Sequence, residues 1–447
     1  MFLKVWSKAV DARLDLVIDK VTSCAQKAYN KKRYIQESLI NTIEVIRHCE
    51  NNRVMGAILS IDQRKAFDSV SHGYMNEVYK FFCFGPNFIK LLETIGNNRT
   101  ARIIFDSNKY SNEIALERGF AQGNSPSPKK YNIGEQILIF RLEFDPNIIG
   151  VYNSFLIPRT VVDDVTHFPL VEQASRTGLT VEEELKETKR RTNAFADDTS
   201  GAFHRSAENL GRVKDILFDF GQISGLETNV EKTALMPIGM LDSPVEQDIL
   251  DLGFEIVDSF KCLGLTINNK ASSLERHFDE KIVKIRQLIG NWSRFNLSLP
   301  GRIAISKTML ISQIGYIGCI VTPTQQQLNV LQSLIDGYAK AGIVIANDRL
   351  YLKPADGGLG LINLNSYIAA LQCSWVKRCS IVINDSWRWT LAASCNFHLD
   401  LVRADNINKE LFPVSHNIAT SFSKLQTEFW KLHGNFLNAP LVDNIFF

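Results

Sequence analysis

Apolar side chains recur at helical spacing near the start of the chain. Residues 3–22 and residues 36–48 each place them three or four positions apart. That period is typical of an amphipathic helix with one buried face. Lys31, Lys32 and Arg33 form a basic stretch between the two segments. The pattern therefore predicts two helices joined by a basic loop.

Short apolar and alternating runs follow, and they predict strands. Residues 54–61 form an apolar run that ends directly before Asp62, and a helical stretch then continues to about residue 84. Residues 100–105 and 113–119 alternate between apolar and polar side chains, as half-buried strands do. A carboxylate at the end of a strand, such as Asp62, occupies a typical position for a functional side chain.

A turn-rich loop, residues 119–128, leads into a helical pattern over residues 131–142. Ser127 stands directly before Pro128, which suits a helix N-cap followed by proline at the first helical position. The helix is therefore expected to begin at the end of the loop.

The second half of this region repeats the alternation of strands and helices. Residues 150–192 show no clear period and end in a run of mixed charge, so we interpret them as an inserted segment. A helical pattern of about 17 residues then ends at Ser224, with Gly225 as its C-cap. Residues 233–237 and 260–267 each read as one strand. Together these elements predict an α+β domain.

From about residue 269 the pattern is wholly helical. Apolar side chains repeat at steps of three and four over residues 282–292, and a second helical pattern covers about residues 300–320. Residues 270–310 carry eight basic and three acidic side chains, so their local charge is +5. Such a surface suits phosphate contacts with a nucleic acid, although a basic helix face is also typical of ordinary solvated helices.

Composition and length limit the class of protein. The chain has 447 residues, of which 45% are apolar and 22% are charged. These values exclude a disordered chain, and the length predicts two to three domains with separate cores. The formal net charge is only +2, so local basic patches must bind any anionic partner.

Cysteine spacing and the absence of a long apolar run indicate an intracellular protein. The eight cysteines lack the closely spaced pairs of disulfide scaffolds and zinc sites. The longest near-apolar stretch, residues 314–321, falls far short of the roughly 18–20 residues that cross a bilayer. We therefore expect no signal peptide, no transmembrane segment and no membrane partner, and an intracellular location.

Three carboxylates stand out as candidate metal ligands. Asp62 follows an apolar strand, and Asp197 and Asp198 lie in a short apolar segment that resembles a β-hairpin turn. Carboxylates brought together in a partly buried site repel one another unless a cation neutralises them, and their hard oxygens suit Mg²⁺. Two such ions about 4 Å apart can activate a hydroxyl and stabilise a leaving oxygen in phosphoryl transfer. The simpler interpretation of Asp197 and Asp198 is an ordinary turn, where Asp is common.

Five segments occur in order along the chain: residues 60–72 (SIDQRKAFDSVSH), 118–128 (RGFAQGNSPSP), 194–198 (AFADD), 224–233 (SGLETNVEKT) and 262–264 (CLG). In this order they resemble the successive palm motifs of reverse transcriptases, most of all those of the non-LTR (LINE-type) retrotransposon branch. Further segments are similar to the fingers and thumb of the same branch: residues 4–10 (KVWSKAV), 26–35 (QKAYNKKRYI), 299–302 (LPGR) and 357–361 (GGLGL). The likeness begins within the fingers, so we expect an N-terminally truncated fragment.

The resemblance implies an α+β right-hand polymerase fold with an antiparallel palm sheet. The chain departs from the family at Lys129 and Lys130, where apolar residues are usual. The expected domains are partial fingers over 1–50, a palm over 51–268 with an inserted segment at about 150–192, a helical thumb over 269–345 and a helical C-terminal extension over 346–447.

The resemblance also implies an RNA-directed DNA polymerase. The 3′-hydroxyl of a DNA primer would attack the α-phosphate of a dNTP opposite an RNA template, with two Mg²⁺ ions, or Mn²⁺ in their place. The alternative is a catalytically inactive retrotransposon relic that only binds RNA or another nucleic acid through its basic helices. Both interpretations keep the fold and differ in nucleotide incorporation.

Catalytic roles follow residue by residue from the resemblance. Asp62, Asp197 and Asp198 correspond to the catalytic metal ligands, and Lys232 to the lysine that protonates the departing pyrophosphate. Phe67, five residues after Asp62, corresponds to the steric gate that disfavours a ribose 2′-OH. The alternative for Lys232 is a lysine that only faces solvent, and the alternative for Phe67 is a phenylalanine of the core.

Contacts with nucleotide and nucleic acid are implied for a second set. Gln122 and Gly123 correspond to the loop that touches the incoming nucleotide and the template. The implied primer and template contacts are the primer-grip residues and two arginines: Phe260, Leu263, Gly264, Arg33 and Arg302.

A second acidic pair, Asp163 and Asp164, competes for the role of the metal-binding turn. We prefer Asp197 and Asp198 because an Ala-Phe-Ala segment surrounds them and the Ser-Gly-Leu and Lys-Thr segments follow in the family's order. The rival pair is expected to lie in the insertion.

Overall fold

The computed structural model describes residues 2–31, 33–96, 99–106, 109–151, 192–242, 244–270, 274–379 and 418–421. These residues form two compact units, the first ending at Asn269 and the second beginning at Lys270. Most of the predicted insertion, with Asp163 and Asp164, lies outside the described residues.

The first unit mixes helices and strands, so the predicted α+β class is confirmed. Up to residue 151 its elements are α1 (Phe2–Leu14), α2 (Ile18–Val21), α3 (Ile35–Asn52), β1 (Met55–Ile61), α4 (Ala66–Ser69), α5 (His72–Phe81), α6 (Pro86–Gly96), β2 (Arg99–Ala101), β3 (Ile104–Asp106), β4 (Lys109–Tyr110), β5 (Ile114–Leu116) and α7 (Ser127–Phe144). From residue 192 they are β6 (Thr192–Phe195), β7 (Asp198–His204), α11 (Ala207–Ser224), a 3₁₀ turn (Val230–Lys232), β8 (Ala234–Gly239), α12 (Gln247–Leu250), β9 (Glu255–Ile256), β10 (Ser259–Cys262) and β11 (Leu265–Asn268).

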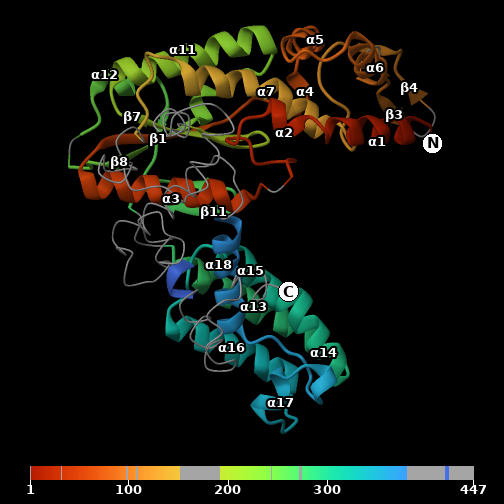
Figure 1. Cartoon of the computed structure of the whole chain (residues 1–447), viewed down its shortest axis with the longest axis vertical. Coiled ribbons are helices and arrows are strands. Elements are labelled where there is room, and N and C mark those ends of the chain that lie inside the picture. The colour runs from red at the N-terminus through yellow and green to blue at the C-terminus, as the bar shows by residue number, and fades with distance from the viewer. Residues whose placement is uncertain are drawn as a thin grey trace, which may run out of the picture. The chain divides into compact units, whose positions relative to one another are not determined.

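A five-stranded sheet with the strand order β6–β7–β1–β8–β9 forms the centre of this unit (Figure 1). β1 lies in the middle and pairs antiparallel with β7 and with β8. β9 pairs parallel with β8. The sheet is therefore mixed and not purely antiparallel as expected, because the crossover through α12 returns the chain to the same end of the sheet.

Helices cover both faces of the sheet. α7 and α11 lie on one face and α3 lies on the other (Figure 1). Leu59 and Ile61 of β1 belong to the same buried core as Tyr131 of α7 and Leu210 of α11. A Cβ added at Gly56 would meet Cys49 of α3 at 3.1 Å. Burial on both faces explains why β1 reads in the sequence as an apolar run.

Helix boundaries in this unit agree with the local sequence signals in one case and differ from them in two. α11 ends at Gly225 as predicted, with φ 79°, and a Cβ there would meet the Ser69 carbonyl oxygen at 2.5 Å. α7 begins at Ser127 and not after it, because the Ser127 hydroxyl donates to the Ala121 carbonyl and does not cap the helix. The single helix expected over residues 3–22 is broken into α1 and α2.

The segment expected as one strand over residues 260–267 is a hairpin. β10 and β11 pair antiparallel, with Cys262 opposite Leu265. Leu263 and Gly264 form the loop between them, with φ 47° and 85°. Positive φ at both loop residues is the geometry of the tight turn whose twist matches paired strands. The apolar character of the whole run hid this turn from the sequence pattern.

Helices make up the described part of the second unit. They are α13 (Arg276–Trp292), α14 (Leu299–Ile305), a π-helical segment (Ser306–Ile311), α15 (Ser312–Gly318), α16 (Gln325–Lys340), α17 (Asn347–Tyr351) and α18 (Leu364–Cys379), with a 3₁₀ turn at Pro354–Asp356. α14, the π-helical segment and α15 follow one another without a gap, which confirms the helix predicted at about 300–320. Trp375 of α18 is fully buried and donates from Nε1 to the Cys319 carbonyl.

None of the helices in the described ranges has the length and apolar character needed to cross a membrane.

Candidate active site

Three predicted carboxylates meet at one end of the sheet. In the antiparallel register of β1 and β7, Ile61 lies opposite Thr199. Continued by one residue, this register puts Asp62 opposite Asp198, and such cross-strand neighbours have Cβ atoms about 4.5–5.5 Å apart. Asp197 precedes Asp198 in the turn between β6 and β7. The fold thus brings together residues that are 135 and more positions apart in the sequence.

The turn that carries Asp197 has a constrained backbone. Phe195 pairs with Asp198, so Ala196 and Asp197 form a two-residue loop. Ala196 has φ 55°, a left-handed conformation that favours glycine. The side chain of Gln26 holds this residue from both sides: its Oε1 accepts from the Ala196 N–H at 2.9 Å, and its Nε2 lies 3.4 Å from the Ala196 carbonyl oxygen.

The charges of the three carboxylates act on one another. Burial raises the pKa of Asp198, and the negative charges of Asp197 and Asp62 raise it further. A cation placed between the three would relieve this repulsion, and carboxylate oxygens are the ligands that Mg²⁺ prefers. Among the described residues, no group of three or more His, Cys, Asp or Glu side chains is arranged so that it could hold a metal ion.

A buried polar network lies beneath the carboxylates, and the sequence patterns did not reveal it. Glu135 of α7 accepts hydrogen bonds from Gln26, Gln63 and Thr199. Burial raises the pKa of Glu135 to about 8, and the charges of nearby aspartates contribute to the shift. The available signal was one acidic residue inside an otherwise buried helix, since charged residues are rarely fully buried without partners.

Lys232 lies on a segment that is attached to the backbone of Asp62. The Asp62 N–H donates to the Thr233 hydroxyl at 3.3 Å, and the Asn229 N–H donates to the Asp62 carbonyl at 2.8 Å. Lys232 itself is exposed in the 3₁₀ turn between these two contacts. The predicted lysine is therefore held near the carboxylate end of β1 by its neighbours.

Phe67 is half-buried and has a defined support. Its ring stacks on Tyr131 of α7 with the centroids 4.6 Å apart. The Tyr131 hydroxyl donates to Oε1 of Gln63, which adjoins Asp62 in the chain. The predicted gate residue is thus tied to the same buried network as the carboxylates.

Gln122 and Gly123 lie in an exposed turn before α7. Gly123 has φ 74°, and a Cβ there would meet no atom within 4 Å, so its backbone conformation and not crowding requires glycine. At the start of the loop, Gly119 packs so closely that a Cβ would meet the Asp68 carbonyl oxygen at 2.6 Å. The loop is thereby fixed at its base and open at its tip.

The β10–β11 hairpin borders the carboxylates. Phe260 and Leu263 line a small cavity together with Asp198 and Ser60. Phe260 is buried, whereas Gly264 is exposed at the loop. The structure thus brings the predicted primer-grip residues beside the predicted metal ligands.

The two predicted arginines are both bonded to backbone carbonyls. Arg33 donates to the carbonyls of Ser23 and Gln26 and lies 3.7 Å from the Asp19 carboxylate. Arg302, in the second unit, donates to the carbonyls of Leu297 and Ala339. Both side chains hold local structure, and their contacts with primer or template remain predictions.

The lysines that depart from the family pattern are compensated by tertiary contacts. Lys129 pairs with Asp11 at 2.7 Å and with Asp15 at 2.6 Å, so it ties α7 to α1 and to the residues that follow it. The Lys130 ammonium lies 5.1 Å from the centre of the Phe120 ring. These contacts explain how two lysines are accommodated where apolar residues were expected.

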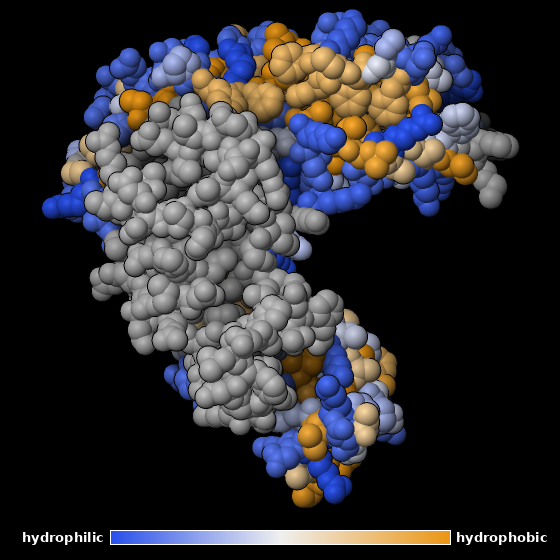
Figure 2. Space-filling model, viewed as in Figure 1, coloured by the Kyte–Doolittle hydropathy of each residue, from blue (hydrophilic) through white to orange (hydrophobic). Residues whose placement is uncertain are grey.

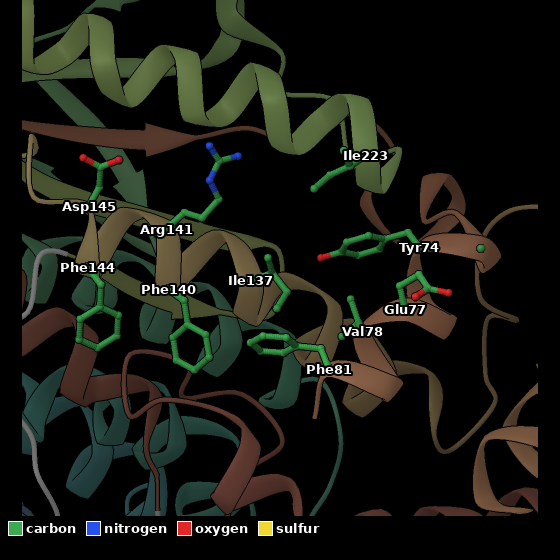
Figure 3. A pocket seen from close by; sticks show the side chains of 11 residues that line it. Tyr74, Glu77, Val78, Phe81, Ile137, Phe140, Arg141, Phe144, Asp145 and Ile223 are labelled. Carbon is green, nitrogen blue, oxygen red and sulfur yellow. The ribbon is translucent and has the colours of Figure 1, made fainter. Parts of the chain in front are cut away.

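A larger groove of about 950 Å³ lies between α5, α7 and α11, away from the carboxylates. Figure 3 shows Phe140 and Phe144 projecting from one side of α7, with Arg141 and Asp145 on the other. Apolar side chains also gather at the surface near α5 and α7 in Figure 2, and Phe81 and Phe144 are among the exposed ones. The lining residues provide few polar groups for chemistry, so the groove is not the candidate active site.

The first unit matches a known protein family, and most of the chain matches a transposon protein. A family model described as Reverse transcriptase (RNA-dependent DNA polymerase) matches residues 1–267. The Transposon TX1 uncharacterized 149 kDa protein of Xenopus laevis is 23% identical over 421 residues, covering 92% of this chain and 29% of the relative. The chain therefore spans less than a third of the length of that relative.

Solved structures show a weaker likeness. Apo telomerase from Candida tropicalis aligns with 97% of this chain and 60% of its own, at 11% identity and a TM-score of 0.40. Telomerase from Candida albicans, in complex with a fragment of telomeric RNA, aligns with 96% of this chain and 57% of its own, at 12% identity and a TM-score of 0.37. These scores are too low to establish a common fold.

Proposed function

Because the chain belongs to the reverse transcriptase family, as its ordered motifs predicted, we propose that it is an RNA-directed DNA polymerase. It extends a DNA primer with dNTPs by copying an RNA template. The family match favours this activity over a protein that only binds nucleic acid. Similarity to a transposon protein supports an origin in a non-LTR retrotransposon.

The observation that carries the proposal is the register of β1 and β7. Continued by one residue beyond Ile61 and Thr199, it puts Asp62 opposite Asp198, beside the turn that contains Asp197. Members of this family depend on a divalent metal, and Asp62, Asp197 and Asp198 supply the carboxylate oxygens that such an ion prefers. A turn that served only to reverse the chain would not need a third carboxylate on the neighbouring strand.

The three aspartates share one task in the reaction. Asp62, Asp197 and Asp198 would hold two Mg²⁺ ions, or Mn²⁺ in their place. When bound, the ions favour the deprotonated primer 3′-hydroxyl and neutralise charge on the leaving group. The 3′-hydroxyl gives its proton to solvent, its oxygen forms a bond to the α-phosphorus, and the bond from that phosphorus to the pyrophosphate oxygen breaks. Lys232 donates a proton to the departing pyrophosphate.

The Phe67 ring and the loop with Gln122 and Gly123 select the nucleotide. Phe67, supported from behind by Tyr131, presents its ring to the sugar and disfavours a ribose 2′-OH. Gln122 and Gly123 contact the incoming nucleotide and the template. Both residues are exposed at the loop tip, which leaves room for these contacts.

Primer and template are bound by separate surfaces. Phe260, Leu263 and Gly264 grip the primer end, which their position beside Asp198 supports. Arg33 and Arg302 contribute to the nucleic-acid path, and the basic residues of α13 contact phosphates without reading sequence.

Primer extension on an RNA template with Mg²⁺ and dNTPs tests the proposal. The wild type is compared with Asp197→Ala plus Asp198→Ala and, as a matched control, with Asp163→Ala plus Asp164→Ala. Loss of the first pair is expected to lower incorporation by more than about 1000-fold, because residues that act as a unit cost most of the activity. The control pair is expected to keep wild-type incorporation.

Other outcomes would separate the alternatives. Equal loss in both double variants would assign no special role to the β6–β7 turn. Absence of incorporation by the folded wild type, together with salt-sensitive binding of the template, would support the protein that only binds nucleic acid.

A further inference from the structure

A fully buried carboxylate lies beneath the three aspartates, contacts the chain neighbours of two of them, and contacts the side chain that holds the neighbour of the third. Glu135 Oε1 accepts from the Gln63 amide at 3.4 Å and from the Thr199 hydroxyl at 2.6 Å. Its Oε2 accepts from the Gln26 amide at 2.9 Å. These partners come from three regions of the chain that lie 64 to 109 positions from Glu135.

Two of the partners adjoin an aspartate of the site in the chain, and the third holds the neighbour of the remaining aspartate. Gln63 follows Asp62, and Thr199 follows Asp198. Gln26 holds Ala196, which precedes Asp197, by accepting from its backbone N–H. One carboxylate thus connects the backbone positions of all three.

We propose that Glu135 is a positioning residue that sets the spacing of Asp62, Asp197 and Asp198 for metal binding. The inference rests on the proposed function, since that function gives the spacing its purpose. Glu135 does not touch the ions or the substrate. It acts through Gln63, Thr199 and Gln26.

The directions of the hydrogen bonds require an acceptor at position 135. Gln26 Oε1 already accepts from the Ala28 and Ala196 N–H groups, so only its Nε2 faces Glu135. Gln63 Oε1 accepts from the Tyr131 hydroxyl, so its Nε2 faces Glu135 as well. A carboxylate accepts at both oxygens, and when protonated it can place its single proton toward the Thr199 hydroxyl, which can also accept; a glutamine would present its NH₂ to the Gln26 or Gln63 amide, donor against donor.

Simple space filling does not account for this residue. A buried carboxylate near other negative charges is costly, and an apolar side chain would fill the same volume at lower cost. Neighbouring positions of α7, such as Ile133, Leu138 and Ile139, are apolar and fully buried. Glu135 instead holds three separate backbone segments that their own charges would drive apart.

An exchange of the two side chains tests the role. In Glu135→Gln, the new amide faces the Gln26 amide, donor against donor. In Gln26→Glu, two carboxylates face each other. In the double variant, the carboxylate now at position 26 can accept from the N–H groups of Ala28 and Ala196 and from the amide now at position 135. The oxygen of that amide can still accept from Gln63 and Thr199. The double variant therefore restores the donors and acceptors between positions 26 and 135 that both single variants disrupt, and loses only the long contact of the position-26 amide with the Ala196 carbonyl.

The readout is Mn²⁺ binding without substrate, followed by electron paramagnetic resonance, alongside the Mg²⁺ dependence of primer extension and the melting temperature. Each single variant is expected to weaken Mn²⁺ binding by about tenfold or more, as is typical when a partner of a metal ligand is lost. The double variant is expected to return to within about threefold of the wild type.

Glu143→Gln is the matched control. Glu143 is also buried on α7 and accepts from the Thr192 N–H at the far end of β6 from the turn. Its loss is expected to lower the melting temperature while Mn²⁺ binding stays within about twofold of the wild type.

Several outcomes would overturn the inference. Folded Glu135→Gln that binds Mn²⁺ as tightly as the wild type would overturn it. A double variant that binds Mn²⁺ no more tightly than the weaker-binding single variant would overturn it as well. If the change at position 135 prevents folding, Thr199→Val removes one of the three bonds and keeps the carboxylate, and unchanged Mn²⁺ binding in that variant would overturn the proposal.

The same experiment separates this inference from the proposed function. Wild-type chain that binds Mn²⁺ but extends no primer would contradict the polymerase activity and leave the comparison of variants intact. Wild-type chain that extends primers, with Glu135→Gln equal to it in both assays, would contradict only the role of Glu135. No Mn²⁺ binding by the folded wild type would overturn both.

Discussion

Two hairpin loops of the first unit share a length and a backbone feature but differ in their support. The β6–β7 loop consists of Ala196 and Asp197, and the β10–β11 loop of Leu263 and Gly264. Each contains a residue other than glycine with positive φ, 55° at Ala196 and 47° at Leu263. Such residues cost about 1–2 kcal/mol and persist where the surroundings hold them.

The first loop is held by distant side chains, and the second contains the residue type that its turn requires. Gln26 lies 170 positions from Ala196 and bonds to its backbone. Gly264 has φ 85°, which glycine adopts without strain. The difference teaches that the loop with the carboxylates depends on tertiary contacts, whereas the proposed primer-grip loop depends more on local conformation.

The largest expected effect is the pH dependence of stability that Glu135, beneath the β6–β7 loop, produces. Burial, with the charges of Asp197 and Asp198, raises the pKa of Glu135 from its usual 4.5 to about 8. Between these values the folded chain keeps a proton that the unfolded chain has released. The contribution of Glu135 to the free energy of unfolding is therefore greatest below about pH 4.5. It falls as the pH rises toward 8, by at most about 1.4 kcal/mol per pH unit for one proton.

Urea unfolding of the wild type and of Glu135→Gln between pH 5 and 8 measures this term. The free energy of unfolding of the wild type is expected to fall more steeply with pH, because position 135 no longer titrates in the variant. The difference between the two chains cancels the other groups, including His48, whose pKa burial lowers to about 4. If the free energies of unfolding of the two chains changed with pH in parallel, the raised pKa of Glu135 would be contradicted.

A smaller effect is expected from exchanging the residue types of the loops. Gly264→Ala is expected to destabilise the chain by about 1 kcal/mol, because its backbone has positive φ and no crowding adds to the cost. Ala196→Gly is expected to stay within about 0.5 kcal/mol of the wild type, since relief of strain offsets the greater freedom of glycine in the unfolded chain.

Urea denaturation of both variants checks this difference. Equal destabilisation of the two would show that the loops are supported in the same way.

The sequence predicted the elements whose signals are local. β1, the helix that ends at Gly225 and the turn with Asp197 and Asp198 are read from apolar runs, a C-cap and a short motif. The β10–β11 turn was missed because Leu263 is apolar and continues the pattern of its neighbours.

The support of the site could not be read in the same way. Gln26 and Glu135 are 109 positions apart, and neither has a spacing that marks it as a partner of the other. Lys129 likewise departs from the family pattern, and its partner Asp11 lies 118 positions away. Hydrogen bonds and ion pairs across such distances depend on the packed fold, which periodicity along the chain does not encode.

The most direct test of the central claim is incorporation of a single dNTP, on an RNA template, by the wild type and by Asp62→Asn. Asp62 follows β1, whereas Asp197 and Asp198 lie where β6 turns into β7, so the test asks whether these two places form one metal site. The account predicts that Asp62→Asn keeps the wild-type melting temperature within a few degrees and lowers the incorporation rate by at least about 100-fold. Incorporation at the wild-type rate by folded Asp62→Asn would contradict it.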